Sequence, residues 1–184
     1  MSNRIDEFER RLASLEATLA NIVAKNIPLS LETTSPGAFN PALAPKSQEI
    51  LFDRELESAT LYSREERSDG IGFRWVGPLP AVMLTTNVPR VSPVTVAVYV
   101  VTALAPENIT NMTILFDGDF AATTTEEWEL GGVVVRATFS PVAGAEHNPV
   151  GIIEIKVPHA SRPPSSNDER VLAVAIHKVT VDAL

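Results

Sequence analysis

The sequence of 184 residues has no cysteine and few aromatic side chains, with 2 Trp, 2 Tyr and 7 Phe. Without cysteine, disulfide frameworks, thiolate zinc sites and cysteine nucleophiles are all excluded. Basic residues are also scarce: 15 Lys and Arg stand against 23 Asp and Glu, which gives a formal net charge of -8. Because nucleic acids and anionic membranes select Lys/Arg surfaces, we expect neither as a partner.

Long hydrophobic segments are missing as well. The longest apolar run, Val94 to Leu104, is interrupted by two threonines and is far shorter than a membrane span. The N-terminus carries charges from Arg4 to Glu16 without an uninterrupted apolar segment, so it lacks the pattern of a secretory signal. We therefore expect a cytoplasmic protein, or one that reaches a virion-like particle or the cell surface by another route.

Residues 1–26 have the pattern of a coiled coil. Apolar residues recur at alternating intervals of three and four: Ile5, Phe8, Leu12, Leu15, Leu19 and Ile22. This a/d stripe is too narrow to build a globular core, so we expect it to pair with copies of itself. The alternative is an amphipathic helix that packs on its own domain.

Charges beside the stripe indicate how many copies associate. Arg4 and Arg11 occupy g positions, and Glu9 and Glu16 follow at e positions, where ion pairs form between parallel chains. The segments 4–9 and 11–16 each fit the pattern Arg-h-x-x-h-Glu, in which h is apolar. They resemble the trimerisation motif of short parallel coiled coils. Mixed Leu, Ile and Phe at a and d also favour a trimer over a dimer. We expect a parallel homotrimer.

The rest of the chain divides into a linker, residues 27–46, and a β domain, residues 47–184. Four prolines exclude a helix in the linker: Pro28, Pro36, Pro41 and Pro45. Segments rich in Val, Ile and Thr follow, separated by turn residues. Strands are expected at 49–58, 72–76, 81–84, 94–104, 112–116, 133–139, 151–157 and 172–181. About eight strands without helical crossovers predict a mainly β fold, an antiparallel jelly-roll-type sandwich.

Motifs of catalysis are almost absent. The histidines, His147, His159 and His177, lack the spacing of a metal-binding pair, and no nucleophile elbow, phosphate loop or dinucleotide fingerprint occurs. Carboxylates are plentiful, so a glycosidase pair stays open, although runs of charge are usually solvated faces. We interpret Asp117-Gly118 as a hairpin turn and not as part of a calcium loop. We expect a protein that is not an enzyme and needs no cofactor or metal.

The stretch from Tyr62 to Pro78 combines acidic residues, a glycine turn and the segment Phe73-Arg74-Trp75. Strand alternation places Phe73 and Trp75 on one face and Arg74 on the other. Trp75 is therefore expected in the core.

Three further positions carry specific expectations. Asp168 and Arg170 flank the start of the last strand, and such residues often pair and hold a loop. Trp128 follows a polar run that we place between strands, so we expect it to be exposed. His177 lies opposite the apolar face of the last strand and is expected at the surface or at a sheet edge.

Together these segments resemble a family of bacterial β-sandwich domains that accompany glycosyltransferases and polysaccharide-modifying enzymes. The resemblance spans about residues 48–184. The matching residues are Tyr62, Glu65, Gly70, Phe73, Arg74, Trp75, Gly77, Pro78, Asp117, Gly118, Pro163, Asp168, Arg170 and Leu172. Ala173 stands where the family has glycine. The resemblance implies a non-catalytic, carbohydrate-binding-like jelly roll that works beside surface-glycan synthesis.

A sugar site needs an aromatic surface for the C–H face of the ring and planar polar groups for the hydroxyls. The candidate residues are Tyr62, Glu65, Arg74, Trp75, Trp128, Asp168 and Arg170. A trimer would add avidity to weak sites. The alternative function is a structural trimer, such as an assembly adaptor or the head of a phage-like fibre or spike. An exposed aromatic beside Arg74 or at Trp128 would favour the glycan-binding function.

Overall fold

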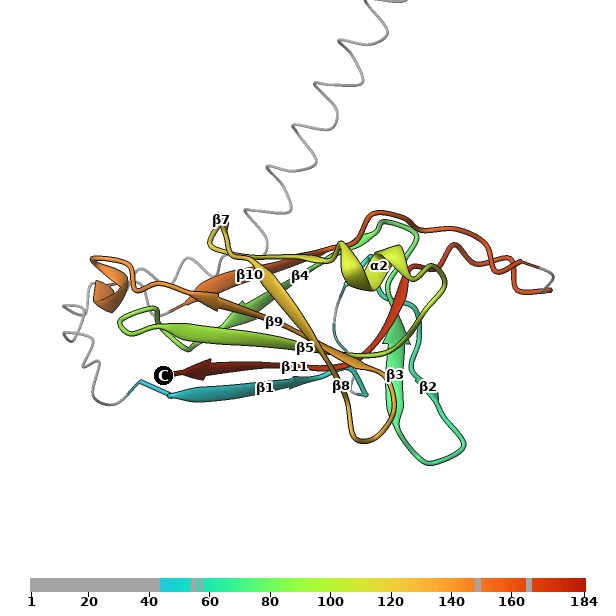
Figure 1. Cartoon of the computed structure of the whole chain (residues 1–184), viewed down its shortest axis with the longest axis horizontal. Coiled ribbons are helices and arrows are strands. Elements are labelled where there is room, and N and C mark those ends of the chain that lie inside the picture. Colours follow the sequence, from blue (N-terminus) through green and yellow to red (C-terminus); the bar gives the residue numbers. More distant parts are fainter. Residues whose placement is uncertain (1–43, 54–55, 57, 148–149, 165–166) are drawn as a thin grey trace, which may run out of the picture. The chain divides into compact units, whose positions relative to one another are not determined.

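Figure 1 shows the computed structural model, in which residues 44–53, 56, 58–147, 150–164 and 167–184 are described. These residues form a mainly β fold with two antiparallel sheets, as the sequence predicts. The residues of the predicted coil lie outside the described residues: Arg4, Ile5, Phe8, Glu9, Arg11, Leu12, Leu15, Glu16, Leu19 and Ile22. Most of the predicted linker lies outside them too.

The larger sheet contains seven strands. They are β1 (Ser47–Leu51), β2 (Glu65–Glu66), β3 (Gly72–Trp75), β5 (Val94–Ala103), β8 (Thr123–Glu127), β9 (Val133–Phe139) and β11 (Val174–Ala183). The order is β2-β3-β11-β5-β9-β8, and β11 is its central strand. One edge of β11 pairs with β5, while the other pairs first with β3 and then with β1.

The smaller sheet contains four strands in the order β4-β10-β6-β7. They are β4 (Ala81–Thr86), β6 (Thr113–Phe116), β7 (Asp119–Phe120) and β10 (Gly151–Lys156). A short helix, α2 (Glu107–Thr110), connects β5 to β6, and a 3-10 turn, η2 (Ala145–His147), precedes β10. No helix among the described residues is long and apolar enough to cross a membrane.

The two sheets share one hydrophobic core. Val94, Val96, Val98 and Val100 alternate along β5 and are each 0% exposed. They pack in one cluster with residues of the smaller sheet: Val82, Leu84, Ile114, Phe116, Ile153 and Ile155. Burying each such side chain stabilises the fold by about 1.5–3 kcal/mol. The buried residues of this core alternate along 94–100 and 153–157, as apolar residues do in the sequence, and the sheets therefore face each other in a sandwich-like arrangement.

The outer face of the larger sheet is apolar as well. Its buried residues form a second group, which we call the outer-face cluster: Phe73, Trp75, Ala97, Val101, Trp128, Val134, Leu172 and Ala175. Ala97 illustrates the pattern, because it lies between two core valines of β5 and yet is 0% exposed. The larger sheet is therefore buried on its inner face and on the part of its outer face that this cluster occupies.

The outer face of the smaller sheet is different. Four of its outward-facing residues are apolar and form what we call the bare face: Met83, Leu115, Phe120 and Ile152. Met83 is 62% exposed, Phe120 68% and Ile152 45%, while Leu115 is half-buried. No element of the described chain covers these side chains.

Most predicted strands are present, but three short ones were missed. The expected segments 72–76, 81–84, 94–104, 112–116, 133–139, 151–157 and 172–181 correspond to β3, β4, β5, β6, β9, β10 and β11. The strand expected at 49–58 overlaps β1, which begins earlier at Ser47 and ends at Leu51. The strands missed are β2, β7 and β8. The polar run placed between strands is in fact β8, an edge strand of exposed Thr and Glu whose lack of alternation hid it.

Candidate functional site

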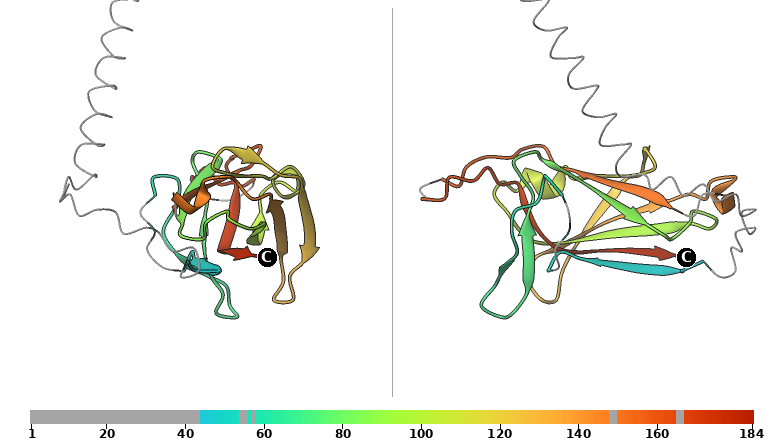
Figure 2. Two further views of the ribbon diagram at one scale, coloured as in Figure 1. Left: turned by 90° about the vertical axis from the view of Figure 1, so that its left-hand side faces the viewer. Right: turned by 180° about the vertical axis from the view of Figure 1, so that it is seen from behind.

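Two hairpins cover the outer-face cluster and meet at their tips. The β2–β3 hairpin and the β8–β9 hairpin project to the same side of the domain (Figures 1 and 2). Arg67 in the first donates from Nη1 to the carbonyl oxygen of Gly131 at 3.1 Å and from Nη2 to that of Leu130 at 2.7 Å. The same guanidinium binds Asp69 and lowers the pKa of that carboxyl. Arg67 thus joins the two tips.

The turn of the β8–β9 hairpin needs glycine. Trp128 donates its backbone N–H to the carbonyl oxygen of Gly132 at 3.1 Å, and Gly132 has a φ of 119°. A Cβ at Gly132 would lie 2.3 Å from the carbonyl oxygen of Val100 on β5. Only a residue without a side chain lets this turn fold so closely onto the sheet.

Trp128 is buried, so the expectation that it is exposed was wrong. Its side chain is 8% exposed. The indole stacks on His177, with ring centroids 5.3 Å apart and planes at 25°, and meets Tyr99 edge to face at 5.5 Å. Sequence alternation gave no sign of this, because the hairpin turn folds the residue back onto the sheet.

His177 also differs from its prediction of a surface or edge position. It is a half-buried residue of the central strand β11, at a bulge between the pairs Ile176–Val100 and Lys178–Tyr99. Its Nδ1 lies 2.6 Å from the carbonyl oxygen of Gly72. Because a carbonyl only accepts, this contact assigns the proton to Nδ1 and fixes the ring against Trp128.

Beside this stack lies an open hollow of about 390 Å³, which we call the Trp128 hollow. It is lined by Tyr99, Glu126, Glu127, Trp128, Glu129, Leu130, Val134, Arg136, His177 and Lys178. Its volume falls within the range of small-ligand sites. The lining combines aromatic rings with both signs of charge, which are the residue types that a sugar site requires.

The charged groups of the hollow are held in place by ion pairs. Arg136 donates from Nε to Oε1 of Glu126 at 2.8 Å, a contact that raises the pKa of the guanidinium. Lys178 lies 2.7 Å from Oε2 of Glu49 on β1, and its Nζ is 4.8 Å from the centre of the Tyr99 ring. The side chains are therefore preorganised around the aromatic surface.

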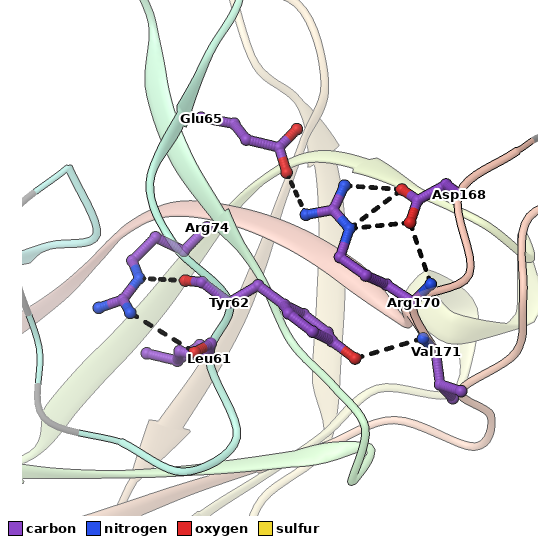
Figure 3. Close-up of polar contacts among 7 residues, drawn as sticks. All are labelled: Leu61, Tyr62, Glu65, Arg74, Asp168, Arg170 and Val171. Carbon is purple, nitrogen blue, oxygen red and sulfur yellow. Dashed lines mark hydrogen bonds and ion pairs between the residues drawn. The ribbon is translucent and has the colours of Figure 1, made fainter.

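Arg170 connects a second group of candidate residues (Figure 3). Its Nε lies 2.9 and 3.0 Å from the two carboxylate oxygens of Asp168, and its Nη1 donates to Oε1 of Glu65 at 2.5 Å. The guanidinium also lies 5.3 Å from the centre of the Tyr62 ring. The predicted pairing of Asp168 with Arg170 is confirmed. Arg170 lowers the pKa of Asp168, so both groups stay charged at neutral pH.

Arg74 binds the backbone on the other side of Tyr62 (Figure 3). It is 9% exposed, and its guanidinium donates to the carbonyl oxygens of Tyr62 at 2.6 Å and of Leu56 at 2.9 Å. Tyr62 in turn accepts a bond at its hydroxyl from the N–H of Val171 at 3.3 Å. Arg74 therefore holds the segment before β2 against the sheet.

The candidate residues thus fall into separate places. Tyr62, Glu65, Asp168 and Arg170 lie together around one guanidinium. Trp128 lies in the hollow. Trp75 is 9% exposed in the outer-face cluster, as expected for a core residue, and contacts Phe73 edge to face. Tyr62 and Trp128 belong to the same cluster or pack against it.

Of the ten residues that line the hollow, only Trp128 was proposed from the sequence. The nine that were missed include Tyr99, Glu126, Arg136, His177 and Lys178. Tyr99 carried a usable signal, because it is out of phase with the core valines of β5. Arg136 and Lys178 carried none, since their approach depends on the pairing of β8 with β9 and of β5 with β11.

The described residues contain no group of three or more His, Asp or Glu that could hold a metal ion. No protein-family model matches the sequence, and no curated protein matches it either.

Proposed function

We propose that the protein is a non-catalytic, homotrimeric carbohydrate-binding module linked to bacterial surface-glycan synthesis or recognition. In this proposal a jelly-roll-type sandwich is presented on an N-terminal coiled coil. The observation that supports it best is the Trp128 hollow, where Trp128 and Tyr99 lie beside the paired Arg136 and Glu126. Aromatic rings for the C–H face of a sugar and fixed planar groups for its hydroxyls then occur at one place.

The form of the hollow favours weak, repeated binding. It is open to solvent, and its Trp128 side chain is only 8% exposed, so a sugar would contact ring edges and the half-buried Tyr99. One such contact gives low affinity, because little of the ligand leaves water. Three sites on one stalk raise the affinity for a repeating polysaccharide by multivalency without any new contact.

The remaining candidate residues have positioning roles in this proposal. The donors of Arg74 bind backbone carbonyls, and Trp75 supports the sheet face. Arg170 binds Asp168 and Glu65, which ties the segment before β11 to β2. These residues would shape the hollow through the β2–β3 hairpin and its Arg67 bonds to the neighbouring tip.

The direct test is binding of the intact, labelled protein to a broad array of bacterial surface glycans. Arg136→Gln should abolish a hit, because it removes the guanidinium and frees Glu126. Arg64→Gln is the matched control, since Arg64 pairs with Glu66 at 2.5 Å, is similarly exposed and does not line the hollow. A hit that survives Arg136→Gln and Glu126→Gln would place the site elsewhere.

A second candidate function is a structural trimer, an assembly adaptor or particle head without a glycan site. Two observations favour it: both tryptophans are less than a tenth exposed, and Arg74 is bound to the backbone. Trp128 is therefore not the exposed aromatic that would favour glycan binding. Failure of a folded oligomer to bind any glycan would support this function over the first.

A further inference from the structure

The bare face carries an apolar side chain on each of the four strands of the smaller sheet. Met83 pairs with Glu154, Glu154 with Leu115, and Leu115 with Phe120, so these four residues form one row across all four strands. Ile152 lies in the next row, opposite Thr85. The neighbours of these residues along each strand, such as Val82 and Ile153, are buried in the core. The outer face of the smaller sheet is thus partly apolar, with Glu154 between Met83 and Leu115.

The exposed apolar side chains of this face make a patch that a partner could cover. From the exposed fractions of Met83, Phe120 and Ile152, the uncovered apolar surface is roughly 350 Å², which is in the range of functional patches on monomers. Glu154, in the middle of the row, pairs with Lys156 at 3.0 Å, so the face carries both signs of charge among its apolar side chains. A surface with exposed apolar side chains and a paired acid and base is suited to a protein partner.

The size of this patch indicates which partner. A stable interface between free proteins buries about 800 Å² on each side, so this face is too small to hold an untethered partner. A copy held by a short linker needs much less. The 20 residues of the predicted linker can span at most about 70 Å even when fully extended, so the β domains of one trimer stay close together and their effective concentration is high.

We propose that the bare face packs against the β domain of a second copy of this chain, around the axis of the homotrimer. This inference rests on the proposed trimer. A face that contacts a different patch on the next copy forms a closed ring of three when the rotation closes. The face is then buried in the trimer and exposed only in a dissociated chain.

The absence of cysteine makes the test specific, because one introduced thiol reports one position. Thr85→Cys places a thiol on the bare face beside Ile152 and preserves its four apolar residues. Thr124→Cys on the exposed edge strand β8 of the larger sheet is the matched control. Both full-length variants are reacted with a maleimide, and light scattering gives the mass of each.

Each variant is measured alone and with Leu12→Asp and Leu15→Asp, which disrupt the predicted coil. We expect the thiol at position 85 to react at least tenfold more slowly in the trimer than in the dissociated chain, with no such change at position 124. Met83→Glu with Phe120→Glu should restore fast reaction at position 85 while the mass stays trimeric. Val142→Glu, at an exposed valine outside the face, should not.

The outcomes separate the two proposals. A monomer or dimer mass would overturn the homotrimer and this inference with it. A trimer in which the thiol at position 85 reacts as fast as in the dissociated chain would overturn the inference alone. Protection that persists in the dissociated chain, or that survives Met83→Glu with Phe120→Glu, would show that another segment covers the thiol and would also overturn it.

Discussion

The outer faces of the two sheets differ in how far their apolar side chains are covered. Both faces carry apolar side chains, but the larger sheet covers its own with two hairpins whose tips Arg67 joins. The smaller sheet has only the short hairpin β6–β7, and Phe120 at its end is 68% exposed. In this chain the longer hairpins thus bury one outer face, whereas the short hairpin leaves the other exposed. The covered face carries the hollow, and the exposed face is the one that we propose for association.

The largest difference in unfolding free energy is expected when one aromatic side chain on each outer face is truncated to alanine. Trp128→Ala should lower the free energy of unfolding by about 3–5 kcal/mol, because it leaves a cavity under the hairpin tips. In the dissociated chain, made with Leu12→Asp and Leu15→Asp, Phe120→Ala should cost about 1 kcal/mol or less, since most of that side chain is in water there. Urea unfolding of both variants in the dissociated chain measures the two values. Equal losses would mean that the two faces are equally covered.

Replacing a glycine at the tip of one hairpin on each sheet should also cost different amounts of stability. Gly132→Ala forces a side chain into a positive φ and against the Val100 carbonyl, so we expect a loss of about 1–3 kcal/mol or more. Gly118→Ala, in the tip of β6–β7, has a positive φ of 83° but no atom within 4 Å of the added Cβ. It therefore measures the backbone strain without the clash. A larger loss at Gly118 than at Gly132 would contradict this account of the covered face.

Acid should loosen the covered face through Asp168. Arg170 holds the pKa of this carboxyl below its unfolded value of about 3.9, so the stabilisation is present above that pH. As the pH falls through the lowered pKa, Asp168 takes up a proton in the folded state and the contribution is lost. Asp168→Asn should be less stable than the unmodified protein at pH 7, and the difference should shrink as the pH falls below about 3.9. Parallel stability curves down to pH 2 would show that the pair contributes nothing.

The sequence predicted what depends on neighbours along one strand. The valines of β5 and the isoleucines of β10 are buried as their alternation indicated, and Asp117-Gly118 forms the β6–β7 turn. The pairing of Asp168 with Arg170 was likewise within reach of a local argument. The coil and its trimer stay predictions, because they lie outside the described residues.

What could not be predicted depends on how distant segments meet. The burial of Trp128 follows from a hairpin that folds back onto β5, and the half-buried position of His177 follows from a bulge in β11. Neither feature leaves a period in the sequence. The Trp128 hollow is therefore a tertiary feature, assembled from β5, β9, β11 and the β8–β9 hairpin.

The smallest predicted effect tests whether the hollow is preorganised. Lys178→Met removes the cation over Tyr99 and the ion pair with Glu49, at a cost of about 0.5–1 kcal/mol, because both contacts are partly exposed. Lys46→Met, in the segment before β1, is a control for the loss of one surface charge. If Tyr99 contacts the sugar through the ring face that Lys178 covers, the variant should also bind an array hit more tightly, since that face becomes free. Unchanged binding with the expected stability loss would place the sugar on the Trp128 and Arg136 side of the hollow.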